Sequence, residues 1–225
     1  MTLQEAMIEL ASMGTDQNRK VYARHGAGPN QFGVSFADLN KLKTTIRTDH
    51  ALACELWRTG NADARNLAVM VADPARMSPK DLDEWVKGVN WYLHADLLAR
   101  HLVSKSPHAR KKADAWTKSK HEFVGQVGWD LVAMLAMNDR DPPDSYFEDR
   151  LAPIESGIHR AKNRVRHAMN GALIAIGLRN AKLRKLALAA AARIGKVEVD
   201  HGDTGCKTPY AADYIRHAVK HTRRK

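Results

Sequence analysis

Trp91, Tyr92, His94 and Asp96 crowd the start of the segment GVNWYLHADLLARHL (88–102), whose apolar spacing otherwise predicts a helix packed into a core. Tyr92 and Asp96 are four residues apart, so on a helix they lie on one face, one turn from each other. A carboxylate and an aromatic ring held together can stabilise a positive charge that develops during a reaction. The carboxylate can equally be structural, because acidic residues stabilise the first turn of a helix or pair with an arginine one turn later.

Two basic segments are candidates for binding phosphate. The segment HARKKADAWTKSKHEF contains Lys111 and Lys112, and the segment NRVRHAMN contains Arg164, Arg166 and His167. The second segment is the better candidate because it begins a predicted helix, where backbone N–H groups also favour an anion. Both segments are also typical of a solvated helix surface.

A third cluster lies in VDHGDTGCKTP, where Asp200, His201, Asp203 and Cys206 fall within seven residues and could suggest a metal site. The spacing matches no established ligand pattern, and the glycines and proline predict a loop that reverses the chain before a final helix capped at Thr208. The chain contains no H-E-x-x-H, Walker or G-x-G-x-x-G motif. We therefore expect neither a metal nor a cofactor.

The elements that position these residues are predicted to be helices throughout, since no segment alternates polar and apolar residues as a strand would. Ser35 is a predicted N-cap, and SPKDLDEWVKG has Ser78 as its cap and Pro79 at the first helical position. The longest predicted helix, over residues 109–138, is expected to bend or break near Gly125 and Gly128. Besides the two capped helices, we predict helices over residues 2–13, 16–25, 50–59, 62–72, 91–104, 109–138, 144–160, 161–178, 181–194 and 209–222.

A polar residue followed by small apolar residues recurs along the chain. Arg65, Asp96, Gln126 and His167 mark equivalent points in ARNLAVMVA, HADLLARHL, GQVGWDLVAMLA and RHAMNGALIAIG, at steps of 31, 30 and 41 residues. This is the size of a two-helix repeat, and it predicts an all-α, HEAT-like superhelix, a curved solenoid of antiparallel helix pairs forming one domain over 1–225. The repeated polar residues would then project into one concave groove. An irregular helical domain with Ala-rich packing is the alternative.

The positive charge of the chain is concentrated in its last third. Residues 1–150 carry 20 Lys and Arg against 20 Asp and Glu, while residues 151–225 carry 16 against 5, which accounts for the net charge of +11. Such asymmetry indicates a polyanionic partner, because Lys and Arg displace the counterions condensed on phosphates. A merely solvated basic surface is the alternative. With two cysteines and no apolar run near 18 residues, we expect a soluble cytoplasmic protein without disulfides or membrane contact.

Several segments, taken in order, carry a resemblance to a known family. They are FGVSFADLNKLK, HALACELWRTGNADARNLAVMVADP, MSPKDLDEWVKGVNWYLHAD, AWTKSKHEFVGQVGWDLVAMLA and NRVRHAMNGALIAIGLRN. Together they resemble the bacterial DNA alkylation repair (AlkD-like) family over nearly the whole chain. The resemblance implies a curved array of HEAT-like repeats that grips double-stranded DNA in a basic concave groove. We expect a monomer that is associated with the nucleoid when bound to DNA. Active members of the family are DNA glycosylases, hydrolases that remove cationic N3- or N7-alkylated purines.

The family pattern has an aromatic residue followed four residues later by Asp, and reading without a gap from Trp85 puts Tyr92 and Asp96 on these positions. The resemblance therefore implies that Asp96 is the catalytic carboxylate, which stabilises an oxocarbenium-like sugar, and that Tyr92 lies beside the lesion. The alternative register puts Trp91 and Ala95 there and removes the acid. We prefer the first register because it also keeps the later Pro-His pair in step with the family.

Two departures from the family pattern weaken the enzyme hypothesis. Gln126 stands where active members resembling this pattern carry Arg, and Gly171 stands where they carry Trp. A glutamine supplies no charge to a phosphate, and a glycine supplies no stacking surface. Trp129, three residues after Gln126, could replace part of the lost contacts, although its surroundings in the sequence are typical of a buried core tryptophan. The alternative function is a HEAT-like DNA-binding or protein-interaction scaffold without chemistry. The residues expected to contact DNA in either case are Lys111, Lys112, Gln126, Trp129, Arg164, Arg166 and His167.

Overall fold

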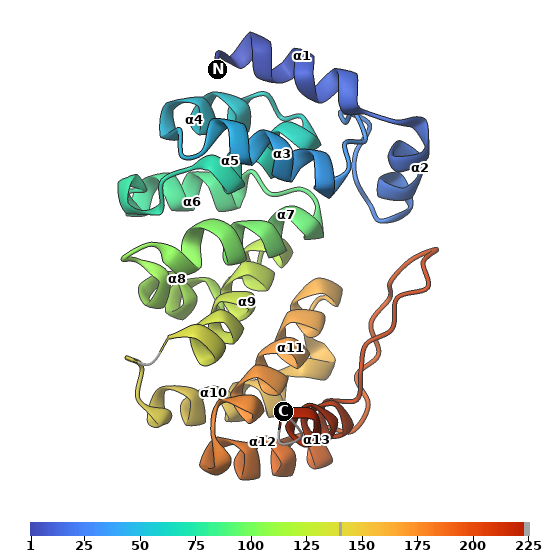
Figure 1. Cartoon of the computed structure of the whole chain (residues 1–225). Helices are drawn as coiled ribbons and strands as arrows, with labels where there is room; N and C mark the ends of the chain where they lie inside the picture. Colours follow the sequence, from blue (N-terminus) through green and yellow to red (C-terminus); the bar gives the residue numbers. More distant parts are fainter. Residues whose placement is uncertain (140, 223–225) are drawn as a thin grey trace. The chain divides into compact units, whose positions relative to one another are not determined.

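The computed structural model describes residues 1–139 and 141–222, and within these ranges it contains helices and no β-strand (Figure 1). The predicted all-α class is therefore confirmed. No helix in the described ranges is long and apolar enough to cross a membrane. The α-helices are α1 (Leu3–Met13), α2 (Asp16–Arg24), α3 (Phe36–Ile46), α4 (His50–Arg58), α5 (Ala62–Val71), α6 (Pro79–Lys87), α7 (Tyr92–Leu97), α8 (Ala109–Trp116), α9 (Glu122–Asn138), α10 (Asp144–Gly157), α11 (Asn163–Arg179), α12 (Ala181–Ile194) and α13 (Ala211–Thr222).

The predicted helix starts at Ser35 and Ser78 are confirmed by their hydrogen bonds. The Ser35 hydroxyl accepts a 3.1 Å hydrogen bond from the backbone N–H of Asp38. The Ser78 hydroxyl accepts one of 3.1 Å from the N–H of Asp81, whose carboxylate accepts one of 3.1 Å from the N–H of Ser78. This reciprocal pair is a capping box, and it satisfies two N–H groups that the first turn of a helix leaves without partners.

The segment predicted as one helix over 109–138 is two helices, and the break lies earlier than predicted. Helix α8 ends at Trp116 and α9 begins at Glu122, while α9 runs without interruption through Gly125 and Gly128. A Cβ atom at Gly128 would lie 2.4 Å from the backbone nitrogen of Thr117. This glycine therefore lets α9 cross closely over the end of α8, and close packing rather than bending explains its presence.

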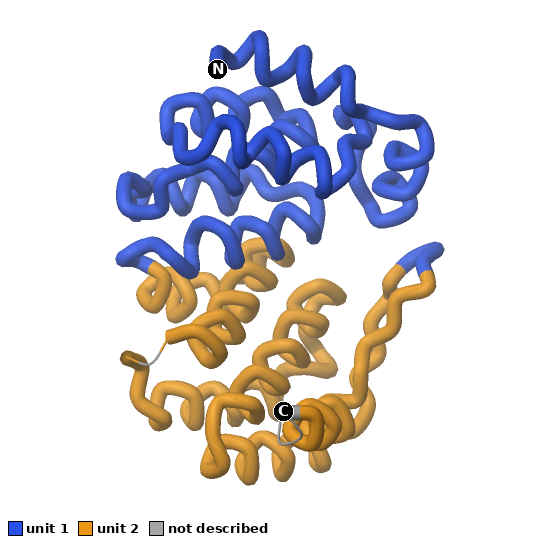
Figure 2. The backbone as a smooth tube through the Cα atoms, in the orientation of Figure 1, with its two compact units in different colours: residues 1–108, 202–204 blue, residues 109–201, 205–225 orange. Residues whose placement is uncertain are grey.

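The chain forms two compact units (Figure 2). Unit 1 consists of residues 1–108 and 202–204, and unit 2 of residues 109–201 and 205–225. A repeat array can divide in this way because each repeat contacts mainly its neighbours. The single domain predicted for 1–225 stays a prediction.

Helix α5 is the centre of unit 1. Nine of its ten residues are buried, so it must be surrounded, and it contacts α1, α3, α4, α7 and the π-helix Leu98–Leu102. Its Asp63 is fully buried, and the carboxylate accepts hydrogen bonds from the backbone N–H groups of Phe32 (2.6 Å), Gly33 (3.0 Å) and Val34 (3.0 Å). One buried charge thus fixes the strand-like segment that leads into α3.

In unit 2 the inner helices are α9 and α11, which pack along each other (Figure 1). Helix α8 packs against α9, and α12 and α13 pack against α11. The guanidinium group of Arg179, at the end of α11, donates to the carbonyls of Ala136 (3.0 Å) and Pro142 (2.9 Å) and lies over the ring of Phe147. A buried cation thus satisfies carbonyl groups at and beyond the C-terminal end of α9, where the helix dipole favours positive charge.

The repeat predicted from the sequence has a direct structural counterpart. The four marker residues, Arg65, Asp96, Gln126 and His167, lie in the first two turns of α5, α7, α9 and α11 respectively. Within the units, α4 packs against α5 and α8 against α9. The pairing predicted from the steps between these residues is therefore seen for α4 with α5 and for α8 with α9.

Replacing Asp63 by Asn should destabilise the protein strongly. An amide offers only one accepting oxygen, so at least one of the buried N–H groups of residues 32–34 would lose its partner. We expect Asp63→Asn to lower the free energy of unfolding by about 2–4 kcal/mol in urea titrations. The control is Asp16→Asn, which removes an exposed ion pair with Arg19 and should cost less than ~1 kcal/mol. Equal losses in the two variants would contradict this role of Asp63.

Candidate functional site

Tyr92 and Asp96 lie on the partly exposed face of α7, in unit 1. Their neighbours in the alternative register, Trp91 and Ala95, are buried, with 2% and 0% of their surfaces exposed. Helix α7 begins at Tyr92, and no side chain caps its first turn. The aromatic ring and the carboxylate are therefore presented one turn apart, at the first and the fifth residue of this six-residue helix.

The Tyr92 side chain is held by the end of α2. The Tyr92 hydroxyl and His25 Nδ1 form a 2.6 Å hydrogen bond, and the indole N–H of Trp91 donates to the His25 carbonyl at 2.8 Å. The ring of Tyr22 packs against that of Trp91 at 5.6 Å. Sequence reasoning missed His25, and no local signal could have found it, because 67 residues separate it from Tyr92.

The α-helix predicted over 91–104 holds only as far as Leu97. It continues as a π-helix over Leu98–Leu102 and a 3-10 turn over Val103–Lys105. Leu97, Leu98, Leu102 and Val103 are all buried. A π-helix aligns residues five apart, so the wider turn places the pairs 97/102 and 98/103 on the core side together. Single π turns occur frequently at functional sites.

His94 and Arg65 connect α7, α5 and α4 in the core. The Nε2–H of His94 donates to the Ala62 carbonyl at 3.1 Å, and burial lowers the pKa of His94 to about 4, so its ring is neutral at physiological pH. The Arg65 guanidinium lies 5.0 Å from the Trp57 ring centroid and donates to the Gly88 carbonyl at 2.9 Å. Burial also lowers the pKa of Arg65. Both side chains therefore form their contacts with other groups of unit 1.

In unit 2, the two departures from the family pattern have different surroundings. Gln126 is buried in α9, with 1% of its surface exposed, and Trp129 is buried one turn further on, with 5% exposed. Gly171 is exposed on α11, and a Cβ atom there would meet nothing within 4 Å. The surface of α11 is therefore open where active members of the resembling family carry a tryptophan.

The basic residues predicted to bind phosphate divide into exposed and internal ones. Lys111 is exposed and Arg164 is partly exposed. Lys112 is buried, and its ammonium group lies 5.4 Å from the ring centroid of Trp116. The guanidinium group of Arg166 donates to the carbonyls of Glu198 (2.7 Å) and Ala161 (3.0 Å), so it braces the segment that follows α12.

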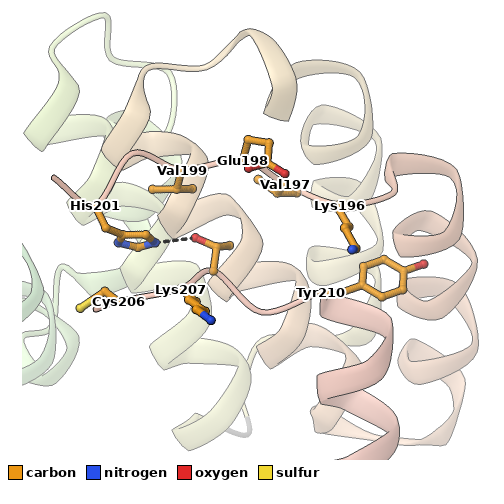
Figure 3. Close-up of a pocket in the computed structure, with 9 residues that line it drawn as sticks. Lys196, Val197, Glu198, Val199, His201, Cys206, Lys207 and Tyr210 are labelled. Atoms are coloured by element: carbon orange, nitrogen blue, oxygen red, sulfur yellow. Dashed lines mark hydrogen bonds between the residues drawn. The ribbon is translucent and has the colours of Figure 1, made fainter. Parts of the chain in front are cut away.

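That segment, residues 195–210, leaves the helices as two extended arms, as the predicted chain-reversing loop requires (Figure 3). The arms line a pocket of about 290 Å³, in which His201 Nε2 lies 2.9 Å from the Thr208 hydroxyl. His167 Nδ1 lies 3.5 Å from the same hydroxyl, and burial lowers the pKa of His167. Within residues 1–139 and 141–222, no group of three or more His, Cys, Asp or Glu side chains is arranged to hold a metal ion.

The fold defines the class of protein. The chain superposes with a TM-score of 0.91 on a solved structure that is 30% identical to it, covering 99% of this chain and 96% of the other. That structure is described as representing "a new family of proteins related to the HEAT-like repeat DNA glycosylases with affinity for branched DNA structures". The HEAT-like repeat fold predicted from the sequence is therefore confirmed.

The particular family follows from the sequence match. The family described as "DNA alkylation repair enzyme" matches residues 6–215, so this chain belongs to the DNA alkylation repair enzyme family. It is also similar to the uncharacterized protein Lin0241 of Listeria innocua, at 26% identity over 97% of both chains. A second similar protein is the uncharacterized protein Lmo0209 of Listeria monocytogenes, at 25% identity over 99% of this chain and 100% of the relative. The resemblance stated from the residues is confirmed.

The buried neutral histidine makes stability depend on pH. The pKa of His94 is about 4 in the folded protein, below its ordinary value of 6.5, so the unfolded chain binds more protons between these pH values. We expect the free energy of unfolding to fall as pH decreases from about 6.5 to 4, by up to ~3 kcal/mol for this residue. Burial gives His101 a pKa of about 4 as well, so it acts in the same direction.

Urea titrations at several pH values test this dependence. His94→Gln should remove part of the loss between pH 6.5 and 4, whereas His121→Gln, which changes an exposed histidine, should retain it. An unchanged pH dependence in His94→Gln would show that His94 does not titrate in this way.

Proposed function

We propose that this protein binds double-stranded and branched DNA through the basic part of unit 2, as a monomer in the cytoplasm. The observation that carries the proposal is the charge of residues 151–225, with 16 Lys and Arg against 5 Asp and Glu. Acidic residues of the same segment can neutralise few of these cations, and the rest favour a polyanion. The solved relative at 30% identity is described as having affinity for branched DNA structures, which supports the same partner here.

The start of α11 is the best candidate for direct contacts with the DNA backbone. Its first turn contains no acidic residue, Lys162 is its N-cap without a side-chain capping hydrogen bond, and Arg164 is its second residue. Glu122 accepts a 2.7 Å hydrogen bond from the backbone N–H of Arg164, so one N–H group of this turn is already used. Phosphate contacts therefore come from the side chains, together with that of the exposed Lys111. Lys112 and Arg166 support this surface through their internal contacts.

Charge reversal at two of these positions should change the salt dependence of binding. Each phosphate contact contributes about −0.9 to the slope of log K against log salt, so Lys111→Glu combined with Arg164→Glu should flatten the slope by ~2. Fluorescence anisotropy with a labelled duplex at several salt concentrations measures this. The control is Lys20→Glu, which reverses an exposed lysine on α2 and should leave the slope nearly unchanged. An unaltered slope in the double variant would mean that these side chains contact no phosphate.

A second candidate function is excision of cationic N3- or N7-alkylpurines, and the presentation of Asp96 favours it. The carboxylate lies on the partly exposed face of α7 with Tyr92, which supports the register preferred from the family pattern. Breaking the glycosidic bond of such a lesion releases a neutral base and leaves an oxocarbenium-like sugar. A carboxylate at C1′ would stabilise this cation and position the water that attacks it. The buried Gln126 and the missing side chain at Gly171 argue for a low rate.

Asp96→Asn separates the two candidate functions. If Asp96 stabilises the transition state, this variant should release 7-methylguanine or 3-methyladenine at least ~10²-fold more slowly, a barrier change of about 2.7 kcal/mol, while binding the duplex at least as tightly. Base release is measured by chromatography, with uracil-containing DNA as a control substrate that should stay intact. Equal release by both proteins would exclude this role for Asp96. No release from methylated duplex, with binding intact, would leave DNA binding as the function.

A further inference from the structure

A second pocket lies in unit 2, and its lining includes Trp129 of α9 and Lys162 at the start of α11. Its volume is about 540 Å³, and it is lined by the α8–α9 connection, α9, the end of α10 and the first turns of α11. Pockets that hold small ligands have volumes of about 300–1,000 Å³, so this one can hold a ligand the size of a nucleotide.

Gly157, the last residue of α10, lines the pocket without a side chain. A Cβ atom at Gly157 would meet only the terminal methyl group of Met169, at 3.6 Å. The backbone of Gly157 has φ −108° and ψ −24°, a conformation that any residue can adopt. Side-chain volume can therefore be added at this position without backbone strain, and the added atoms would occupy the pocket.

The inner lining suits a flat heterocycle. Trp129, Val165 and Met169 all line the pocket and are an aromatic, an aliphatic and a thioether side chain, with 5% of Trp129 and 4% of Met169 exposed. Nucleic acid bases stack on aromatic rings whatever their sequence, because every base has a π face, and methionine sulfur also packs favourably against aromatic systems.

The outer lining supplies positive charge without a counter-ion. Lys120 and Lys162 both line the pocket and both are exposed. Neither ammonium group forms an ion pair with an acidic side chain in the described chain. Two uncompensated cations beside an apolar, aromatic cavity are complementary to an anionic group attached to a flat ring.

We propose that this pocket receives one unpaired nucleotide of DNA, with its base against Trp129 and its phosphate between Lys120 and Lys162. The inference rests on the proposed DNA binding, because a branch point supplies nucleotides that lack a pairing partner. The subsite would give branched DNA a contact that fully paired DNA lacks, and it is separate from Tyr92 and Asp96.

The test compares two three-way junctions that differ at one unpaired nucleotide in the branch, which carries adenine in one and an abasic sugar in the other. We expect the wild-type protein to bind the adenine junction about 10-fold more tightly, since stacking of one base on an aromatic ring contributes a factor of this order. Gly157→Leu should abolish this preference and leave the affinity for a fully paired duplex unchanged. Gly28→Leu is the matched control, because a Cβ atom there meets nothing within 4 Å and the residue lies in unit 1.

The lysines are tested separately. Lys120→Ala and Lys162→Ala should each weaken binding of the adenine junction, whereas Lys118→Ala, in the same connection but outside the pocket lining, should retain the 10-fold preference. If wild type binds both junctions equally while duplex binding is intact, the pocket proposal is overturned and the proposed function stands.

A direct titration tests the pocket even if the protein binds no DNA. With methyl-labelled methionine, the resonance of Met169, assigned by Met169→Leu, should shift on addition of deoxyadenosine monophosphate in wild type and not in Gly157→Leu. If the protein binds no DNA, the proposed function fails, and this titration alone decides the pocket: a saturable shift supports the nucleotide subsite, and no shift, or an equal shift with a fatty acid of similar size, overturns it.

Discussion

The buried carboxylate of Asp63 is the interaction on which unit 1 depends. It fixes residues 32–34 through three backbone N–H groups. Side chains of α2 in turn form hydrogen bonds to this segment. The hydroxyl of Tyr22 donates to the Val34 carbonyl at 2.7 Å, and the guanidinium group of Arg19 donates to the Phe32 carbonyl at 3.0 Å. His25 at the end of α2 then holds the Tyr92 hydroxyl. One charge in α5 thereby determines where the aromatic half of the candidate site lies.

The basic side chains of this protein fall into an internal group and an exposed group. Arg65, Arg166 and Arg179 direct their guanidinium groups to backbone carbonyls, where the planar fork of donors satisfies groups that helix ends and turns leave without partners. Arg164 and Lys111 are at least partly exposed and lie where an anion can reach them. The net charge of the sequence therefore overstates the number of cations that can contact DNA. The fold uses part of that charge for its own stability.

Two glycines of unit 2 show what a missing side chain does, and the one at Gly171 affects the two candidate functions differently. At Gly128 the missing side chain permits close helix packing, and at Gly171 it leaves the exposed surface of α11 without an aromatic ring. A surface without that ring loses stacking and cation–π contacts with a lesion but can still face the DNA backbone. The proposed DNA binding should therefore tolerate this departure from the family pattern better than the proposed base excision would.

The helical class, the caps at Ser35 and Ser78, the two-helix repeat and the family could all be predicted from the sequence. Caps and apolar periodicity depend on residues only a few positions apart. The break before Glu122, the π turn after Leu97, and the contact between His25 and Tyr92 could not be predicted in this way. The same holds for the positions of Lys112 over an aromatic ring and of Lys111 in an exposed place. These features depend on which faces meet across distant helices, and that depends on close packing of the whole core, which no local pattern encodes.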